Sequence, residues 1–225
     1  TSRAVPDVVD ALHLASTTAC EKAGIPLGSV RSVGAGIAGQ LDARTQKILV
    51  GPNLGWRDVD LATPLAAKLG KPVTLANDLA AATLGEATHG AAEGHRDALL
   101  VFVGSGIGAG LVLDGKPYRG TRGVGGELGH VKVVVNGRRC GCGEYGCLEA
   151  YAGGHNLAAR AIEAARKRGE STLSAFGDRL TTTDLLHAAD TGDALAASMR
   201  DEAADLVALV AANAVTLLNP SIVIL

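Results

Sequence analysis

Aromatic residues are scarce in this chain of 225 residues, which has one tryptophan, three tyrosines and two phenylalanines, or 3% of the total. Proteins that bind single-stranded nucleic acid stack bases on such rings, and clustered lysines and arginines hold the phosphates. The 21 basic and 23 acidic residues give a net charge of −2 and are scattered rather than gathered in blocks. We therefore expect no nucleic acid as a partner of this segment.

The sequence also lacks an apolar run long enough to cross a membrane. Its most apolar stretch, residues 206–218, is interrupted by Asn213 and Thr216 and is shorter than the roughly 20 residues that a bilayer requires. We expect this stretch to be a buried core helix, with no membrane partner. No secretory signal peptide is visible, although the chain starts at Thr1 rather than Met, and we expect a cytoplasmic protein.

Cysteine is sparse too, with four residues, but Cys140, Cys142 and Cys147 fall within eight positions, and His130 precedes them by ten. Three thiolates and one imidazole on a short glycine-rich segment are typical ligands of a closed tetrahedral zinc site. The competing interpretation is a disulfide, but Cys140 and Cys142 are too close to pair without strain, and one thiol would be left over. The spacing favours zinc, since nothing else suggests an oxidising compartment.

The apolar pattern alternates between helical and strand periods, which indicates an α/β fold. A connector at residues 90–96, rich in glycine, alanine and charge, suggests a domain boundary near residue 94. Helices are predicted at residues 6–22, 64–69, 79–88, 157–168, 183–189 and 194–218, and strands at 32–37, 47–50, 72–76, 98–103, 109–113 and 221–225. The last strand stops without a turn or cap, so we expect the chain to be cut there.

Asp78 is the candidate general base. It follows Asn77 where the strand at 72–76 gives way to a helix, and in α/β folds the carboxyl end of a strand faces the usual ligand crevice. The neighbouring amide of Asn77 could orient a hydroxyl substrate. The alternative for this dipeptide is a helix N-cap, which is a common role of both residue types.

Residues 104–110 form a glycine-rich link between two apolar strands, with backbone amides and one hydroxyl that could cradle phosphate oxygens. The segment is neither a P-loop, because it lacks the Gly-Lys-Ser/Thr ending, nor a dinucleotide fingerprint, because a strand rather than a helix follows it. A plain hairpin turn remains an equally good interpretation. The candidate phosphate ligands are Gly104, Ser105, Gly106, Gly108 and Gly110.

Glu127 and Glu149 flank the cysteine cluster at its two ends. If zinc folds residues 130–147 into a compact knuckle, these carboxylates and His130 can be held rigidly beside one another, as the vicinal hydroxyls of a sugar would require. The alternative for each glutamate is a solvated surface charge.

Together these segments resemble the ROK family of bacterial sugar kinases and sugar-responsive repressors. The resemblance is carried by residues 99–126 with their glycine spacing, Gly126-Glu127-Leu128-Gly129-His130, Cys140-Gly-Cys142-Gly-x-x-Gly146-Cys147-Leu148-Glu149, Asn77-Asp78 and the loop 51–56. It implies an actin-like, ribonuclease-H-like α/β fold of two domains, with sugar in the cleft between them and ATP across the hinge. The smaller N-terminal domain would be residues 1–94, and the larger domain, with the zinc knuckle, residues 95–225.

The resemblance further implies ATP-dependent phosphorylation of a hexose, with glucose as the expected hexose, Mg²⁺ on the nucleotide, structural Zn²⁺ and a homodimer. Asp78 would be the catalytic base that takes the proton of the sugar's 6-hydroxyl, and His130 would serve both metal and sugar. The implied sugar ligands are Asn77, Asp78, Glu127, His130 and Glu149, the phosphate loop is Gly104, Ser105, Gly106, Gly108 and Gly110, and the zinc ligands are His130, Cys140, Cys142 and Cys147.

Two segments of the family pattern are missing, namely a first phosphate loop of the Asp-x-Gly-Gly-Thr type and a glycine-rich adenosine segment expected just after Leu225. We interpret both as truncation and expect little kinase activity from these 225 residues alone. The alternative functions are a sugar-sensing repressor, with its DNA-binding domain before residue 1, and a kinase for mannose, fructose, N-acetylglucosamine or N-acetylmannosamine. A zinc hydrolase is disfavoured, because four protein ligands leave the ion no position for water.

Overall fold

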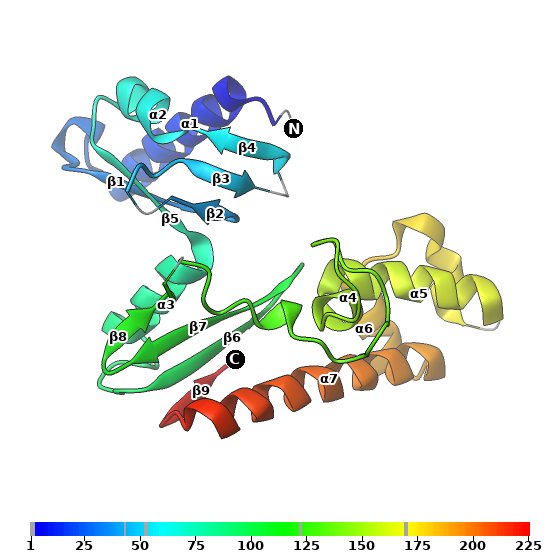
Figure 1. The fold of residues 1–225 in the computed structure, drawn as a ribbon. Coiled ribbons are helices and arrows are strands. Elements are labelled where there is room, and N and C mark those ends of the chain that lie inside the picture. Colours follow the sequence, from blue (N-terminus) through cyan, green and yellow to red (C-terminus); the bar gives the residue numbers. More distant parts are fainter. Residues whose placement is uncertain (1–2, 43, 52–53, 122, 169–170) are drawn as a thin grey trace. The chain divides into compact units, whose positions relative to one another are not determined.

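The computed structural model describes residues 3–42, 44–51, 54–121, 123–168 and 171–225 (Figure 1). Pro52 and Asn53, in the loop 51–56 singled out above, lie outside the described residues. The chain forms two compact units, unit 1 with Thr1–Gly85 and Arg119–Gly125, and unit 2 with Glu86–Tyr118 and Gly126–Leu225. The first division between the units lies inside helix α3 (Asp78–His89), between Gly85 and Glu86, whereas the sequence pattern suggests a boundary near residue 94.

Unit 1 contains two small sheets with two helices beside them (Figure 1). Strands β1 (Val33–Ile37) and β5 (Val73–Asn77) pair in parallel, and β2 (Gln40–Leu41), β3 (Ile48–Gly51) and β4 (Trp56–Val59) form an antiparallel sheet. The helices are α1 (Val5–Ala23) and α2 (Ala62–Leu69), and a short 3-10 turn, η1, covers Leu27–Ser29. Helix α1 ends at Gly24, whose φ of 67° is readily adopted by glycine.

One core holds unit 1 together. Val9 of α1 and Leu65 of α2 pack in it with Ile37 and Leu75 of the parallel pair and Ile48 of the antiparallel sheet. The sheets and both helices therefore share apolar contacts, and this packing holds β5 in place.

Unit 2 is built on a sheet with the strand order β8-β7-β6-β9. Its strands are β6 (Ala98–Val103), β7 (Ile107–Leu113), β8 (Lys116–Tyr118) and β9 (Ile222–Ile224), with β6 and β9 parallel and the other pairs antiparallel. Leu99 and Val101 of β6 face helix α7 (Ala194–Leu218), whereas Leu100 belongs to a second cluster with Ala92. Burial on both faces explains why β6 is apolar at nearly every position.

The helices of unit 2 gather along one half of α7 (Figure 1). They are α4 (Glu149–Ala152), α5 (Gly154–Arg168), the 3-10 segment η4 (Thr172–Arg179) and α6 (Thr182–Asp190), and a shorter 3-10 turn, η3, covers Leu128–His130. Thr181 and Asp184 form a capping box that starts α6. The helices of unit 2 share one core, which includes Leu148, Leu157, Leu173 and Leu185.

Helix α7 has the predicted bounds, but the prediction that residues 206–218 are buried is wrong in part. Leu209 is 50% exposed and Leu217 is 84% exposed, because α7 packs on the sheet with one side only. Among the described residues, no helix has both the length and the apolar character needed to cross a membrane.

Candidate active site and metal centre

Asn77 and Asp78 lie where β5 passes into α3. Asn77 is the last residue of β5, paired with Ile37 of β1, and Asp78 is the first residue of α3. Oδ1 of Asn77 accepts the backbone amide of Ala80 at 2.9 Å, and its Nδ2 donates to the carbonyl of Gly39 at 3.1 Å. Asn77 is therefore the N-cap of α3.

The side chain of Asp78 is exposed at the N-terminus of α3, where the helix dipole favours a negative charge. Its Oδ1 accepts one hydrogen bond from the amide of Leu79 at 2.9 Å and another from Nδ2 of Asn77 at 3.2 Å. Among the described residues, Oδ2 has no hydrogen-bond or ion-pair partner. Because Asn77 supplies the cap, one oxygen of Asp78 stays open to a ligand.

The turn between β6 and β7 is short, because β7 begins at Ile107. The amide of Gly104 donates to the carbonyl of Gly106 at 2.9 Å, and Val103 pairs with Ile107 as the turn closes. Within the described part of the chain, the amides of Ser105 and Gly106 and the hydroxyl of Ser105 make no hydrogen bond. The turn thus offers two amides and one hydroxyl to an anion.

Gly108 and Gly110, grouped with this turn in the sequence, lie within β7. Successive amides of a strand point to opposite sides, and the amide of Ala109 points away from β6, to the carbonyl of Gly126 at 2.7 Å. The amides of Gly108 and Gly110 therefore face β6. Among residues 104–110, the open donors are those of Ser105 and Gly106.

The segment Gly126-Glu127-Leu128-Gly129-His130 runs close beside β7. A Cβ on Gly126 would lie 2.2 Å from the carbonyl oxygen of Ala109, and one on Gly129 would lie 2.3 Å from that of Ile107. Any side chain at these two positions would push the segment away from the strand. The two glycines thereby set the backbone from which Glu127 and His130 project.

The knuckle, residues 130–147, contains only short turns and isolated bridges, and the structure describes all of its residues. Lys132 and Cys147 form one antiparallel bridge, and a second lies nearer the tip. At the tip the amide of Cys140 donates to the carbonyl of Glu144 at 2.7 Å. Other backbone hydrogen bonds join Val133 to Gly146 and Gly146 to Arg138, both at 2.8 Å. These bonds are irregular, so the knuckle combines turns with the side-chain cluster described next.

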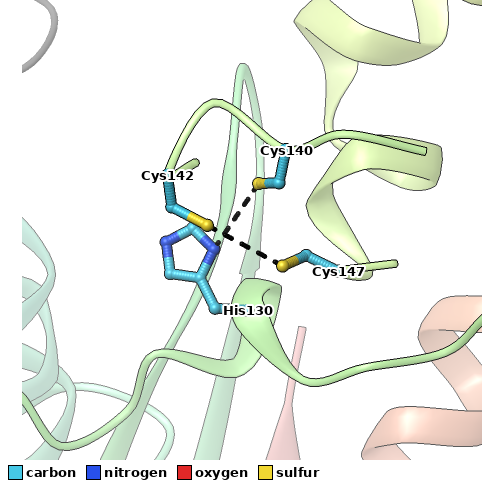
Figure 2. Close-up of side chains that lie close together, drawn as sticks. All are labelled: His130, Cys140, Cys142 and Cys147. Atoms are coloured by element: carbon cyan, nitrogen blue, oxygen red, sulfur yellow. Dashed lines mark hydrogen bonds between the residues drawn. The ribbon is translucent and has the colours of Figure 1, made fainter. Parts of the chain in front are cut away.

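Figure 2 shows His130, Cys140, Cys142 and Cys147 turned towards one another. Their ligand atoms all lie within 4.8 Å of one another. Sγ of Cys142 is 3.8 Å from Sγ of Cys147, and Sγ of Cys140 is 3.8 Å from Nδ1 of His130. Two sulfurs on a tetrahedral zinc ion with Zn–S bonds of about 2.3 Å are about 3.8 Å apart, whereas a disulfide requires about 2.05 Å. All cysteines are free, and the donor set fits zinc.

Charge around the cluster is set by burial and by one lysine. Burial raises the pKa of the Cys140 thiol to about 12. Nζ of Lys132 donates to Sγ of Cys147 at 3.2 Å, which raises the pKa of that lysine, and lies 3.8 Å from Oε2 of Glu144. A zinc ion with three thiolates would carry a net charge of −1, which the ammonium of Lys132 offsets.

The two ring nitrogens of His130 face different groups. Nδ1 faces the thiol of Cys140, while Nε2 lies 3.8 Å from Oε2 of Glu127, beyond direct hydrogen-bond distance. A double role in metal and sugar binding would require such an arrangement. At the other end of the knuckle, Oε2 of Glu149 accepts the backbone amide of Ile107 at 3.0 Å.

The predicted site residues therefore form two groups. Unit 1 holds Asn77 and Asp78 together, and unit 2 joins the knuckle to the β6–β7 turn through Glu149. Sequence reasoning missed the contact of Lys132 with the cluster, because a single surface lysine carries no signal. The bridge register that pairs it with Cys147 is visible only in the fold.

A glucokinase from Halalkalibacterium halodurans is 36% identical over 197 residues, which are 86% of this chain and 60% of the relative. A xylose repressor from Caldicellulosiruptor bescii is 30% identical over 198 residues, 87% of this chain and 50% of the repressor. A ROK family glucokinase from Streptomyces griseus, solved in complex with glucose and AMPPNP, has a TM-score of 0.83 and 34% identity, and the match covers 97% of this chain and 70% of that one.

These likenesses confirm the predicted fold class, the actin-like, ribonuclease-H-like α/β fold of the sugar kinases. The chain spans about 60% of the length of the glucokinases that it matches over 197 residues. The family model, described as the ROK family, matches residues 2–225. The chain therefore belongs to the ROK family.

Proposed function

We propose that the protein transfers the γ-phosphoryl group of ATP to the 6-hydroxyl of a hexose, and that this hexose is glucose. The observation that carries the proposal is the open carboxylate oxygen of Asp78. Asn77 already caps α3, so the fold does not need Asp78 for that purpose. A carboxylate within reach of a hydroxyl takes its proton as the oxygen attacks phosphorus.

The sugar would be held by Asn77 beside the base and by Glu127, His130 and Glu149 around the knuckle. Carboxylates accept hydrogen bonds from hydroxyls, and Nε2 of an imidazole that binds metal through Nδ1 can donate one. The glucose complex of the Streptomyces griseus relative supports a sugar of this kind. The ligands of unit 2 adjoin one structural cluster, which suits recognition of neighbouring hydroxyls.

The nucleotide phosphates would lie against the turn at residues 104–106, with Mg²⁺ on the nucleotide to neutralise the charge of the transferring group. An apolar groove of about 830 Å³ adjoins this turn in unit 2, within the size range of small-molecule sites. It is lined by Gly104, Ser105, His155, Thr182 and Val207 among others. The AMPPNP in the Streptomyces griseus relative supports ATP as the donor.

Zinc bound by His130, Cys140, Cys142 and Cys147 would supply rigidity and no chemistry, because four protein ligands leave no open position. The residues of the chain hold the sugar and move the proton. The four free cysteines also support a reducing, cytoplasmic location. A homodimer is the oligomeric state that we propose, and light scattering of the purified protein tests it.

A coupled assay of ADP release by the full-length protein tests the function. The hexoses to compare are glucose, mannose, fructose, N-acetylglucosamine and N-acetylmannosamine. We expect ADP release to depend on hexose and to be fastest with glucose, with the phosphate on the 6-oxygen of the product. A faster rate with another hexose would correct the substrate, and the absence of hexose-dependent release would contradict the kinase.

A sugar-responsive repressor is the second candidate, favoured by the xylose repressor that matches 87% of this chain. A repressor would bind a sugar without consuming ATP. Calorimetric sugar binding by a full-length protein that releases no ADP, together with sugar-dependent retention of operator DNA, would select this function instead.

A further inference from the structure

Glu149, two residues after the end of the knuckle in the chain, contacts the β6–β7 turn. Its Oε2 accepts the amide of Ile107 at 3.0 Å in a partly buried hydrogen bond. A Cβ on Gly106 would lie 2.5 Å from the same oxygen, so only glycine admits the carboxylate at this distance. Oε1 has no hydrogen-bond partner among the described residues. One oxygen is thus committed to the turn and the other is open.

The backbone around Glu149 is well anchored. Leu148 is fully buried, and its amide donates to the carbonyl of Val131 at 2.9 Å. Cys147, two residues before Glu149, belongs to the metal cluster, and Ala150, one residue after it, is buried in the knuckle core. The carboxylate therefore extends from a rigid base that ligation of the knuckle would strengthen.

The turn is held from a second direction by the start of α5. The amides of Gly154 and His155 donate to the carbonyls of Gly104 and Ser105 at 2.9 and 3.0 Å. These bonds hold the carbonyl side of the turn, whereas Glu149 holds the amide of Ile107. Without Glu149, that amide would lose a charged acceptor, the stronger kind of hydrogen-bond partner.

We propose that Glu149 is a positioning residue for the phosphate turn, in addition to any contact with sugar. It holds Ile107 through Oε2, so that the open amides of Ser105 and Gly106 keep one orientation, and it leaves Oε1 for a sugar hydroxyl. The same carboxylate couples the sugar ligands of unit 2 to the turn. The role in phosphate binding rests on the proposed kinase function, and the contact with the turn does not.

Amide exchange measured by NMR on the 225-residue chain tests the contact without reference to activity. We expect Glu149→Ala to speed exchange at Ile107 by about tenfold or more, and Glu149→Gln to do so less, because its amide oxygen still accepts a hydrogen bond. Glu144→Gln is the matched control, because that exposed carboxylate lies in the knuckle and, among the residues that the structure describes, pairs with Lys132 alone. Zinc content and circular dichroism report whether each variant is folded.

Exchange at Ile107 that stays within about twofold of wild type in both folded Glu149 variants would overturn the proposal. If Glu149→Ala does not fold, Glu149→Gln decides by the same criterion. The full-length enzyme gives a separate result: Glu149→Gln is expected to raise KM for ATP as well as for hexose. A rise for hexose alone would overturn the coupling to phosphate. Lack of wild-type kinase activity would reject the proposed function and leave the exchange result standing.

Discussion

The β5–α3 junction of unit 1 and the knuckle of unit 2 hold their candidate site residues by different means. At the junction, Asn77 and Asp78 lie between a strand of five residues and a helix of 12, both with regular backbone hydrogen bonds. The knuckle has isolated bridges and turns, and it brings three thiols and one imidazole within 4.8 Å. The junction is ordered by regular secondary structure, whereas the knuckle combines irregular backbone hydrogen bonds with a side-chain cluster.

Because of this difference, the two regions should respond differently to loss of zinc. A strand-to-helix junction needs no ion to keep its shape, whereas a structural zinc site contributes folding free energy directly. Metal loss should therefore disorder Glu127, His130 and Glu149 and spare Asp78. Variants that change only the β5–α3 junction or only the knuckle show whether each region keeps its structure without the other.

The largest effect is expected from Cys147→Ser, because Cys147 is fully buried in the cluster. Zinc content should fall from one equivalent to near zero, and the knuckle should lose its order. Trp56, the sole tryptophan, lies in the core of unit 1 and should keep its fluorescence. Cys20→Ser is the control, because Cys20 lies outside the cluster. Retention of zinc by Cys147→Ser would remove Cys147 from the ligand set.

Asp78→Asn should lower kcat of the full-length protein by about a thousandfold, within the range for loss of a general base. The fold of unit 1 should not change, because Asn77 caps α3 without help from Asp78. Thermal unfolding and the coupled ADP assay measure the two effects. Asp7→Asn, an exposed carboxylate in the first turn of α1, is the control. A rate within a few fold of wild type would contradict the assignment of Asp78 as base.

Lys132→Met should weaken zinc retention by about tenfold, since contacts that support metal ligands commonly account for 10- to 100-fold in affinity. The variant removes the ammonium that donates to Sγ of Cys147. Release of zinc to a chromogenic chelator measures the effect. Arg139→Gln removes a positive charge from the same knuckle and should release zinc at the wild-type rate. Equal release rates in Lys132→Met and wild type would show that the lysine does not stabilise the cluster.

Asp193→Ala should lower the free energy of unfolding by about 1 kcal/mol, because Asp193 is the N-cap of α7. Burial opposes its ionisation, but hydrogen bonds from Ala196, Thr172 and Ser171 outweigh burial and hold its pKa at about 2. A pKa below the ordinary 3.8 means that this stability is complete above about pH 4 and is lost as the pH falls towards 2. Denaturant unfolding from pH 5 to 2 should show this component in wild type and not in Asp193→Ala.

Long apolar patterns were predicted well from the sequence. The bounds of α7 and β6 match the predicted ranges, because each has a sustained period or an unbroken apolar run. The short strands β2, β4 and β8 were not predicted. Their few residues carry too little pattern, and they form because neighbouring strands pair with them.

The metal cluster was accessible to sequence reasoning because ligand type and spacing are both visible in the sequence. The sequence did not show which of Asn77 and Asp78 caps α3, since either residue type can cap a helix. The acceptor role of Glu149 was equally hidden, because its partner is the backbone amide of Ile107, and an amide has no sequence signature. Contacts made to backbone depend on register, which only the fold supplies.

Hydrogen–deuterium exchange of the 225-residue chain, with one equivalent of zinc and after its removal by a chelator, tests the contrast between the two regions most directly. On zinc removal we predict faster exchange throughout residues 126–149 and unchanged exchange at residues 73–80, which contain the β5–α3 junction. Unchanged exchange in the knuckle, or an equal increase in both regions, would contradict the account.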